Sequence, residues 1–303
     1  MTGTNTFSAA DLVAVIPEVW GTKVLEAYFA KTVAANFFLD LSDLAPEGDT
    51  LHVPDLFTNS MASAAKSNGS EVTLNSPTQT DTTIAMSTWR HVAYLVEDKE
   101  LKQAARIYAV LDMYARQAGD TLADDLEDTL LGLWSGLSTT AGTTSAAVTD
   151  LQIRQCVRRL DVNNVPNADR GWFFHPINYW DQIAAAAKFY DASQYGGPTF
   201  ARTGNFGEVF DFNRGFRGVL YGDPVFISTN VVSNLTAYRN IYAHKDAFGY
   251  VVQTPGEAHI RMQSEYVLEN LGVLTVCDII YGAGELRDSS AVVLNGSTSA
   301  STA

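Results

Sequence analysis

The feature that most constrains this chain is a long helical pattern over residues 112–137. Apolar residues recur here every three or four positions, which places them on one stripe of the helix. They are Leu111, Ala115, Ala118, Leu122, Leu126, Leu130, Leu133 and Leu137. At a rise of about 1.5 Å per residue, a helix of about 26 residues is roughly 39 Å long, which exceeds the width of a small domain. The pattern therefore predicts an elongated helix whose leucine stripe packs on another layer.

The opposite side of this helix is acidic. The charged residues on it are Asp112, Arg116, Asp120, Asp124, Asp125, Glu127 and Asp128. Asp120, Asp124 and Asp128 stand four residues apart, so their like charges form one row and slightly oppose the isolated helix. Gly119 weakens the middle of the helix as well. Packing of the leucine stripe, and not helix propensity, must therefore stabilise this element.

The composition predicts a chain with a sizeable core and no affinity for nucleic-acid backbones. Of its 303 residues, 46% are hydrophobic and 11% aromatic, which is enough for one large or two ordinary domains. Its 20 Lys and Arg residues against 34 Asp and Glu residues give a formal net charge of −14. A uniformly acidic chain is repelled by phosphates, so it can lie beside nucleic acid but is not expected to bind it specifically.

The cysteines and the start of the sequence indicate a cytoplasmic origin. Cys156 and Cys277 lie in apolar segments without CxxC spacing, which predicts buried free thiols in a reducing compartment. No basic-then-apolar leader opens the sequence, and no apolar run approaches about 18 residues. We expect a soluble protein that is made in the cytoplasm.

The residues before the long helix form an arm followed by a long hairpin. Pro17 interrupts a short helix, and the aromatic-rich residues that follow, up to residue 40, must pack on the chain's own body or on a neighbour. Residues 48–56 and 84–97 have strand patterns and flank about 25 mostly polar residues. A loop of that length indicates function, disorder or an intermolecular reach.

Helix and strand patterns alternate after the long helix. A Ser, Thr, Gly and Ala-rich connector at 138–149 precedes a short helix at 151–160. A buried strand at 172–174 follows, and a second helix runs from Pro176 through Ala187. This alternation predicts an α/β lobe. A loop rich in Gly, Tyr and Phe, residues 188–206, comes next.

Strand patterns dominate the remainder, in four segments: 209–232, 242–253, 261–282 and 287–295. The first is broken at residues 222–224, the second also fits a short helix, and the third is bent near residues 270–272. Residues 296–303 form a disordered tail by composition.

No motif carries recognisable chemistry, so we predict no catalytic, cofactor-binding or metal-ligating residue. Only i,i+4 pairs of the acidic group 124–128 face the same way and no histidine accompanies them, so we expect a solvated face and not a metal site. The histidines are scattered along the chain and show neither an HExxH motif nor paired spacing. They are His52, His91, His175, His244 and His259. The glycine-rich residues 204–218 fit neither a P-loop nor a dinucleotide fingerprint, and there is no GxSxG elbow.

In their order along the chain, these segments resemble the major capsid proteins of tailed bacteriophages, which have the Hong Kong 97-type capsid fold. The sequence IPEVWGTKVLEAYFAKTVAANFFLD (16–40) followed by GDTLHVPDL (48–56) is similar to the family's N-terminal arm and the entry to its extended loop. The polar hairpin 50–95 resembles that loop, and MYARQAGDTLADDLEDTLLGLWSG (113–136) resembles the spine helix.

The resemblance continues to the end of the chain. The sequence VNNVPNADRGWFFHPINYWDQI (162–183) is similar to the entry of the family's central axial lobe. The closing portion is matched by HKDAFGYVVQ (244–253) and YVLENLGVLTVCDIIYGAGELRDSSAVVL (266–294). The match thus covers nearly the whole length.

The resemblance implies an α+β subunit with five parts. These are an N-terminal arm (1–47), an extended loop hairpin (48–97), a peripheral domain with the spine helix and a long sheet (98–148 with 255–286), an axial domain (149–254 with 287–295) and a disordered tail (296–303). The leucine stripe would then pack on a sheet built from residues 84–97 and 261–281. Gly119 would be a place for the helix to bend as a shell expands.

The resemblance also implies a structural role and no enzymatic activity. Subunits of this family form hexamers and pentamers that close into an icosahedral phage head around double-stranded DNA. The expected partners are further copies of the chain, a separate scaffolding protein, a portal at one vertex, optionally a decoration protein, and packaged DNA contacted without specificity. We expect no cofactor and no membrane, assembly in the host bacterial cytoplasm, and a final location in the virion.

Two variations within the family bear on this chain. Some members cross-link a loop lysine to an asparagine of a neighbour; Lys66 is the only lysine of the loop, and we interpret it as a solvated side chain. Some members begin with a scaffolding domain, whereas this sequence begins almost at once with the arm, which is why a separate scaffolding protein is expected. Two alternatives stay open: an encapsulin-like cellular shell protein and an α/β hydrolase-type enzyme.

Overall fold

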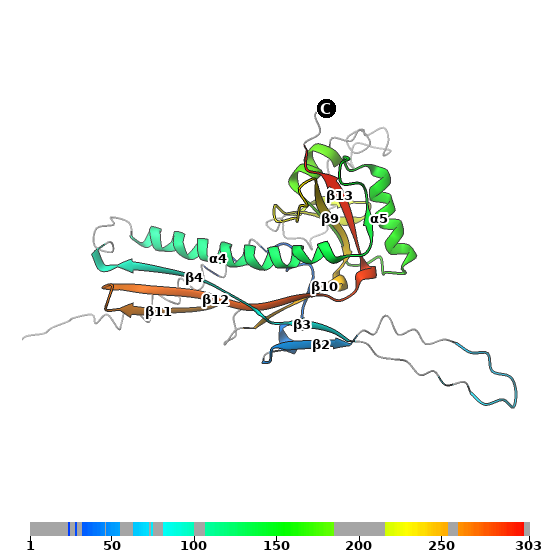
Figure 1. Cartoon of the computed structure of the whole chain (residues 1–303), viewed down its shortest axis with the longest axis horizontal. Helices are drawn as coiled ribbons and strands as arrows, with labels where there is room; N and C mark the ends of the chain where they lie inside the picture. The colour runs from blue at the N-terminus through cyan, green and yellow to red at the C-terminus, as the bar shows by residue number, and fades with distance from the viewer. Residues whose placement is uncertain are drawn as a thin grey trace, which may run out of the picture.

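The computed structural model describes residues 24, 28, 32–45, 47–54, 63–72, 74, 81–99, 107–184, 216–253 and 260–299. These residues form an elongated part, in which one long helix lies along a sheet, and a compact lobe at one end of it (Figure 1). No described helix is both long and apolar enough to cross a membrane. Most of the predicted arm 1–47, the loop 188–206 and the glycine-rich residues 204–215 lie outside the described residues.

The long helix, α4 (Ile107–Gly132), continues into a 3-10 turn, η2 (Leu133–Gly136). The predicted helix is confirmed, although it begins at Ile107 and not at Asp112. Leu122, Leu126 and Leu130 are fully buried in the largest core cluster, as the leucine stripe requires. Gly119 is also buried in this helix, and its role as a bending point stays a prediction.

The long sheet supplies the layer on which this stripe packs. Its strands are β1 (Leu39–Asp40), β10 (Phe248–Gln253), β12 (Gly272–Glu285), β11 (Arg261–Val267) and β4 (Thr88–Glu97). β12 is central, since it pairs with β4 along one edge and with β11 and then β10 along the other. The Tyr281 hydroxyl of β12 donates a hydrogen bond to the Asp125 carbonyl of α4 at 2.9 Å, which ties helix to sheet.

One sequence interpretation of this sheet is refined and another needs correction. The bend expected near residues 270–272 is a full reversal: β11 and β12 are antiparallel partners, and the chain reverses between Val267 and Gly272. Leu271 carries the left-handed φ of 44° in this reversal. Residues 242–253 are not one element, because they divide between β9 of the compact sheet and β10 of the long sheet.

The compact lobe contains a six-stranded sheet of order β5-β13-β9-β6-β8-β7. The strands are β5 (Thr140–Ala141), β13 (Ala291–Ser297), β9 (Ala237–His244), β6 (Arg170–Phe174), β8 (Asp223–Ile227) and β7 (Phe216–Leu220). Helix α5 (Asp150–Val162) covers one face with Ile153, Cys156 and Leu160 buried. The predicted helix, the buried strand and the break at residue 222 are confirmed, and both Cys156 and Cys277 are buried free thiols.

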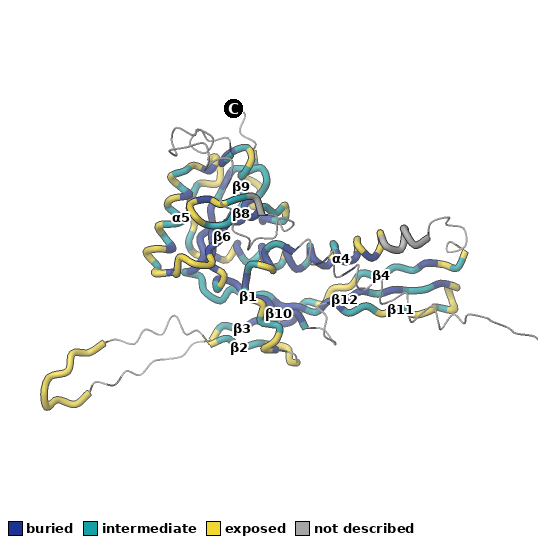
Figure 2. The backbone as a smooth tube through the Cα atoms, turned by 180° about the vertical axis from the view of Figure 1, so that it is seen from behind, coloured by how far each residue is buried: buried dark blue, intermediate teal, exposed yellow. Residues whose placement is uncertain are grey.

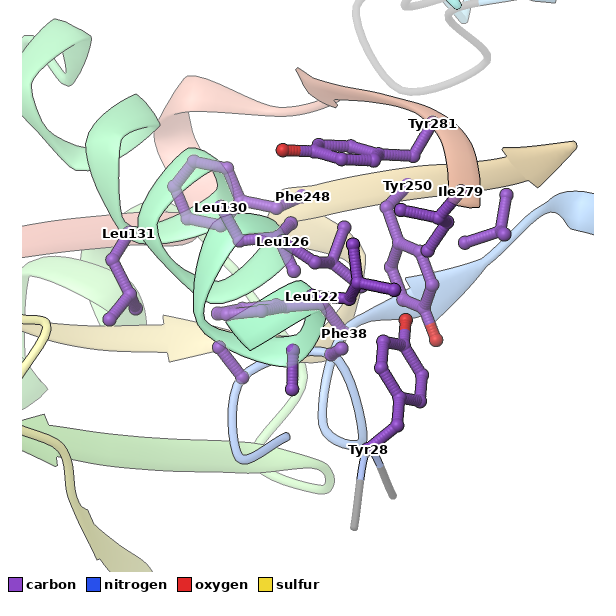
Figure 3. Close-up of a cluster of buried hydrophobic side chains, with 14 of the residues drawn as sticks. Tyr28, Phe38, Leu122, Leu126, Leu130, Leu131, Phe248, Tyr250, Ile279 and Tyr281 are labelled. Carbon is purple, nitrogen blue, oxygen red and sulfur yellow. The ribbon is translucent and has the colours of Figure 1, made fainter. Parts of the chain in front are cut away.

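Two phenylalanines of the N-terminal segment join the two sheets. The Phe38 ring lies 5.4 Å from Phe173 of the compact sheet and 5.1 Å from Phe248 of the long sheet, measured between ring centroids. Phe37 contacts Phe173 and Phe226 at 5.3 and 5.7 Å. One hydrophobic core therefore runs from the leucines of α4 to the inner face of the compact sheet (Figure 3).

A hairpin is present as predicted, with β2 (Thr50–Pro54) as its first arm, but its second arm is β3 (Asp81–Ala85) and not the expected segment 84–97. Ile84 and Met86 anchor it in a small core with Val251. The described loop residues 63–72 are exposed and lie away from both sheets (Figure 2). The hairpin thus projects from the end of the long sheet near the compact lobe (Figure 1).

Strand pairing groups some residues differently from the predicted parts. β4 belongs to the long sheet and not to the loop hairpin, and β10 belongs to the long sheet although residues 149–254 were expected in the axial domain. β5 joins the compact sheet, and β13 extends to Ser297, into the expected tail. The division into five parts as such stays a prediction.

Candidate functional site

The long sheet presents one covered face and one open face. Side chains alternate along a strand, so Cys277, Ile279 and Tyr281 of β12, which belong to the core with α4, alternate with residues of the opposite face. The open face contains a shallow hollow of about 580 Å³. It is lined by Trp89, His91, Arg261, Gln263, Ser264, Glu265, Leu274, Val276 and Asp278. The hollow thus spans β4, β12 and β11.

Three hydrogen-bonded residues, Trp89, Arg261 and Asp278, form a trio that fixes the Trp89 side chain on this face. Asp278, only 5% exposed, accepts a bond from Trp89 Nε1 at 2.9 Å and bonds from Arg261 Nε and Nη2 at 2.9 and 2.6 Å. Burial opposes ionisation of Asp278, but the bonds from Arg261 and Trp89 outweigh it and lower its pKa. The Trp89 ring is held in place while 65% of the residue stays exposed. Fixed tryptophan and arginine side chains are typical of protein–protein hot spots.

Further apolar side chains are exposed on the projecting hairpin and on the compact lobe. On the loop, Val72 and Leu74 are 65% and 89% exposed. The exposed apolar residues of the compact lobe are Leu151, Val162, Trp180, Val219, Tyr221 and Leu235. Among the described strands, β4 and β7 pair along one edge only, which leaves edges to which another chain can add. These surfaces suit contacts with other subunits and not a small ligand.

At the base of the hairpin, His52 Nδ1 of β2 and Asp81 Oδ2 of β3 lie 2.5 Å apart. The hydrogen bond to His52 lowers the pKa of Asp81. Lys66, the candidate for a cross-link, is exposed in the described part of the loop.

The acidic group of α4 differs from the solvated face that we expected. Asp128 is exposed, and Asp124 accepts a bond from Asn230 Nδ2 at 3.3 Å. Glu127, in contrast, is 2% exposed and accepts three backbone N–H bonds, so the prediction is wrong for this residue. Among the described residues, no group of three or more His, Cys, Asp or Glu side chains is arranged to hold a metal ion.

The sequence contained a signal for this burial. Ala123 and Leu131, four residues before and after Glu127, are both fully buried. Residues spaced by four share one row on a helix, so Glu127 sits in a second buried row beside the leucine stripe. Its carboxylate must then find partners inside the protein.

The described histidines have separate local partners. His91 lines the hollow, and His244 Nδ1 accepts a bond from the Asp246 amide at 3.2 Å. The His175 ring stacks on Tyr238 with 3.5 Å between centroids, and burial lowers its pKa to about 4. His259 lies outside the described residues.

Comparison with known proteins gives no sequence match but consistent structural matches. No family model matches the chain, and no curated protein matches its sequence. A structure from Mycobacterium phage Che8 aligns with a TM-score of 0.66 and 17% identity over 87% of this chain and 91% of that chain. The capsid of Ralstonia phage GP4 aligns with a TM-score of 0.65 and 11% identity over 90% of this chain and 93% of that chain. The chain has the Hong Kong 97-type capsid fold.

The capsid fold also occurs in a third match, a virus-like particle from Pyrococcus furiosus, with a TM-score of 0.55 and 13% identity over 92% of this chain and 99% of that chain. The expected α+β capsid fold is therefore confirmed, and the α/β hydrolase-type alternative is set aside as a fold. In the capsid fold, α4 takes the place of the spine helix that the sequence resemblance implied. Among the described residues, the open sheet face and the hairpin loop carry exposed apolar side chains, Trp89 on the face and Val72 and Leu74 on the loop.

Proposed function

We propose that this chain is the major capsid protein of a tailed bacteriophage, which self-assembles as hexamers and pentamers into an icosahedral head around double-stranded DNA. The main support is the capsid fold, which aligns with phage structures over 87% to 90% of the chain. The elongated subunit, with a projecting hairpin and an open sheet face, suits an obligate assembly with large shared interfaces.

In the proposed shell, the hairpin of one subunit covers the open sheet face of its neighbour. Val72 and Leu74 supply apolar side chains on the loop, and Trp89, Leu274 and Val276 are apolar residues among those that line the hollow. Complete burial of a leucine or valine side chain contributes about 1.5–3 kcal/mol. The Asp278 trio fixes Trp89 in advance, so little side-chain entropy is lost when the neighbour binds.

The charge of the chain fits a container for DNA. With a formal net charge of −14, subunits repel phosphates, so packaged DNA can move along the inner surface without adhering. A separate scaffolding protein, a portal at one vertex, an optional decoration protein, assembly in the bacterial cytoplasm and a final place in the virion belong to the same proposal. Lys66 is assigned no cross-linking role in it.

A direct test is to express the chain alone and together with candidate scaffolding proteins, and to size the products by sedimentation and negative-stain microscopy. Closed shells of uniform diameter are expected when the scaffolding protein is present. Correct shells from the chain alone would remove the scaffolding part of the proposal. A stable monomer that never forms particles under any of these conditions would contradict the capsid function.

The docking arrangement is tested by Trp89→Ala. We expect an intact subunit, because Trp89 is mostly exposed and Arg261 still pairs with Asp278, but a large loss of particles in the same sedimentation assay. Leu44→Ala is the control, since Leu44 is 67% exposed and lies outside the hollow. Equal particle yields from both variants would exclude the open sheet face as a docking surface.

A cellular shell protein is the second candidate, supported by the match to the Pyrococcus furiosus virus-like particle. The contents of purified particles distinguish the two functions. Packaged double-stranded DNA supports the phage head, and a protein cargo supports the cellular shell.

A further inference from the structure

Glu127 of α4 forms an unusual contact with the N-terminal segment. Its Oε1 accepts bonds from the amides of Val33 and Ala35 at 2.7 and 3.0 Å, and its Oε2 accepts a bond from the amide of Ala34 at 2.9 Å. Three consecutive backbone donors, more than 90 residues away in the sequence, thus converge on one carboxyl group that is 2% exposed. A buried carboxylate needs such donors, and without them it is costly.

The segment bound in this way is structurally important. The turn at residues 33–38 continues directly to Phe37 and Phe38, the rings that join the long and compact sheets. On the other side of the turn, Tyr28 is 3% exposed and lies next to Tyr250 in the same core (Figure 3). Glu127 therefore holds the turn between the buried Tyr28 and the two rings that pack on the sheets.

The surroundings of Glu127 disfavour its charged form. Burial raises its pKa to about 7 although the three amides act in the opposite direction. The titratable groups that face it are Asp124 from its own helix, Tyr28 from the N-terminal segment and Tyr250 from β10; Asp40 and Tyr281 act on those tyrosines in turn. Each of these groups is acidic or phenolic, so none offers a positive charge to compensate the carboxylate.

We propose that Glu127 is a proton-linked latch, which holds residues 33–35 more tightly when its carboxyl group is neutral than when it is charged. A neutral carboxyl keeps a carbonyl oxygen that can still accept the two bonds now made to Oε1, and it no longer carries a buried charge. In a shell, which rests on the function proposed above, the latch would couple acidity to the freedom of the N-terminal segment to leave the body for a neighbour.

The direction follows from proton linkage. In the seated state, in which residues 33–35 are bound to Glu127, its carboxyl group has a pKa of about 7. In the released state, in which these residues have left and water reaches Glu127, its pKa returns to the ordinary value of 4.5. Protons therefore bind the seated state more strongly, and the ratio of seated to released segment rises about tenfold per pH unit as the pH falls from about 7 toward 4.5. From pH 8 to pH 5 the expected change in this ratio is on the order of 50-fold.

Amide hydrogen exchange of the full, unassembled chain between pH 5 and pH 9 measures this ratio. After correction for intrinsic exchange rates, the protection of Val33, Ala34 and Ala35 is expected to fall by that factor as the pH rises from 5 and to level off above about 7. Glu127→Gln, which mimics the neutral acid, should retain protection and lose the pH dependence. Asp128→Asn, an exposed neighbour on the same helix, should behave like the wild type.

Equal pH dependence in the wild type and Glu127→Gln would overturn the latch. If Glu127→Gln does not fold, the wild type decides alone: protection of residues 33–35 that changes no more than that of the α4 amides would overturn it as well. The measurement needs no particles, so a chain that fails to form shells would contradict the proposed function and leave the latch intact.

Discussion

Gly282 of β12 determines how the hairpin sits on the long sheet, and Gly282→Ala tests this. A Cβ atom at this position would lie 2.3 Å from the Ala85 carbonyl oxygen, 2.9 Å from the Ala85 carbonyl carbon and 3.1 Å from Met86 Cα. All three are backbone atoms, whereas an ordinary carbon–oxygen contact is about 3.3 Å or longer. No flexible side chain can yield, so β3 itself must move by about 1 Å.

Two responses are open to the variant, and their costs can be compared. If β3 shifts and stays packed, overpacking costs about 1–3 kcal/mol. If the hairpin leaves the sheet, Ile84 and Met86, now 0% and 7% exposed, lose their burial at about 1.5–3 kcal/mol each. The shift is cheaper, so we expect a loss of about 2–3 kcal/mol in the free energy of unfolding, near the upper end of the overpacking range.

The matched control is Gly132→Ala, at the end of α4. A Cβ atom there meets nothing within 4 Å, and the backbone is helical with φ −62° and ψ −33°. Replacement of a helical glycine by alanine stabilises by about 0.5–1 kcal/mol. Urea unfolding followed by circular dichroism, with hydrogen exchange of the β2 and β3 amides, measures both variants. If the free energy of unfolding of Gly282→Ala lies within about 0.5 kcal/mol of the wild-type value and the hairpin amides are equally protected, the close approach of Gly282 to the Ala85 carbonyl is refuted.

Two further substitutions test the core. Phe38→Ala removes the ring between Phe173 and Phe248 and should cost about 3–5 kcal/mol in urea unfolding; a loss below about 1 kcal/mol would show that this ring does not join the sheets. Leu126→Ala, at a fully buried position, should cost about 2–5 kcal/mol, whereas Met113→Ala, 68% exposed on the same helix, should stay within about 0.5 kcal/mol. Similar thermal unfolding of these last two variants would contradict the assignment of the buried helix face.

The elements that could be predicted from the sequence are those stabilised by local pattern. The leucine spacing of α4 repeats with the helix itself, and the alternation in β2 marks the first arm of the hairpin, whereas most of the second arm, β3, lies in the stretch interpreted as polar loop. The break between β7 and β8 was visible because Gly222 takes a left-handed φ of 98°, which glycine adopts without strain. In each case the residue type alone carries the conformational information.

The missed features depend on contacts between distant segments. Only the short 3-10 turn Lys245–Ala247 separates β9 from β10, and nothing local indicates that the two strands enter different sheets. The bend expected near residues 270–272 is present, but its extent, a full reversal with the positive φ on Leu271, is set by the pairing of β11 with β12. Glu127 was grouped with its aspartate neighbours because all are acidic; its row with Ala123 and Leu131 indicates burial, but the partners that it finds in residues 33–35 could not be predicted from local sequence.

The shape of the elongated part supports a function that depends on surfaces. Among the described elements, α4 covers one face of the long sheet, and Trp89 on the opposite face stays 65% exposed. A sheet is normally stable when both of its apolar surfaces are covered or one is clearly polar. Here the open face is mixed, because the apolar residues Trp89, Leu274 and Val276 lie among polar residues such as Arg261 and Asp278. In the proposed shell, contact with another subunit would remove the exposed Trp89 ring from water, while the bond to Asp278 would keep its indole N–H satisfied.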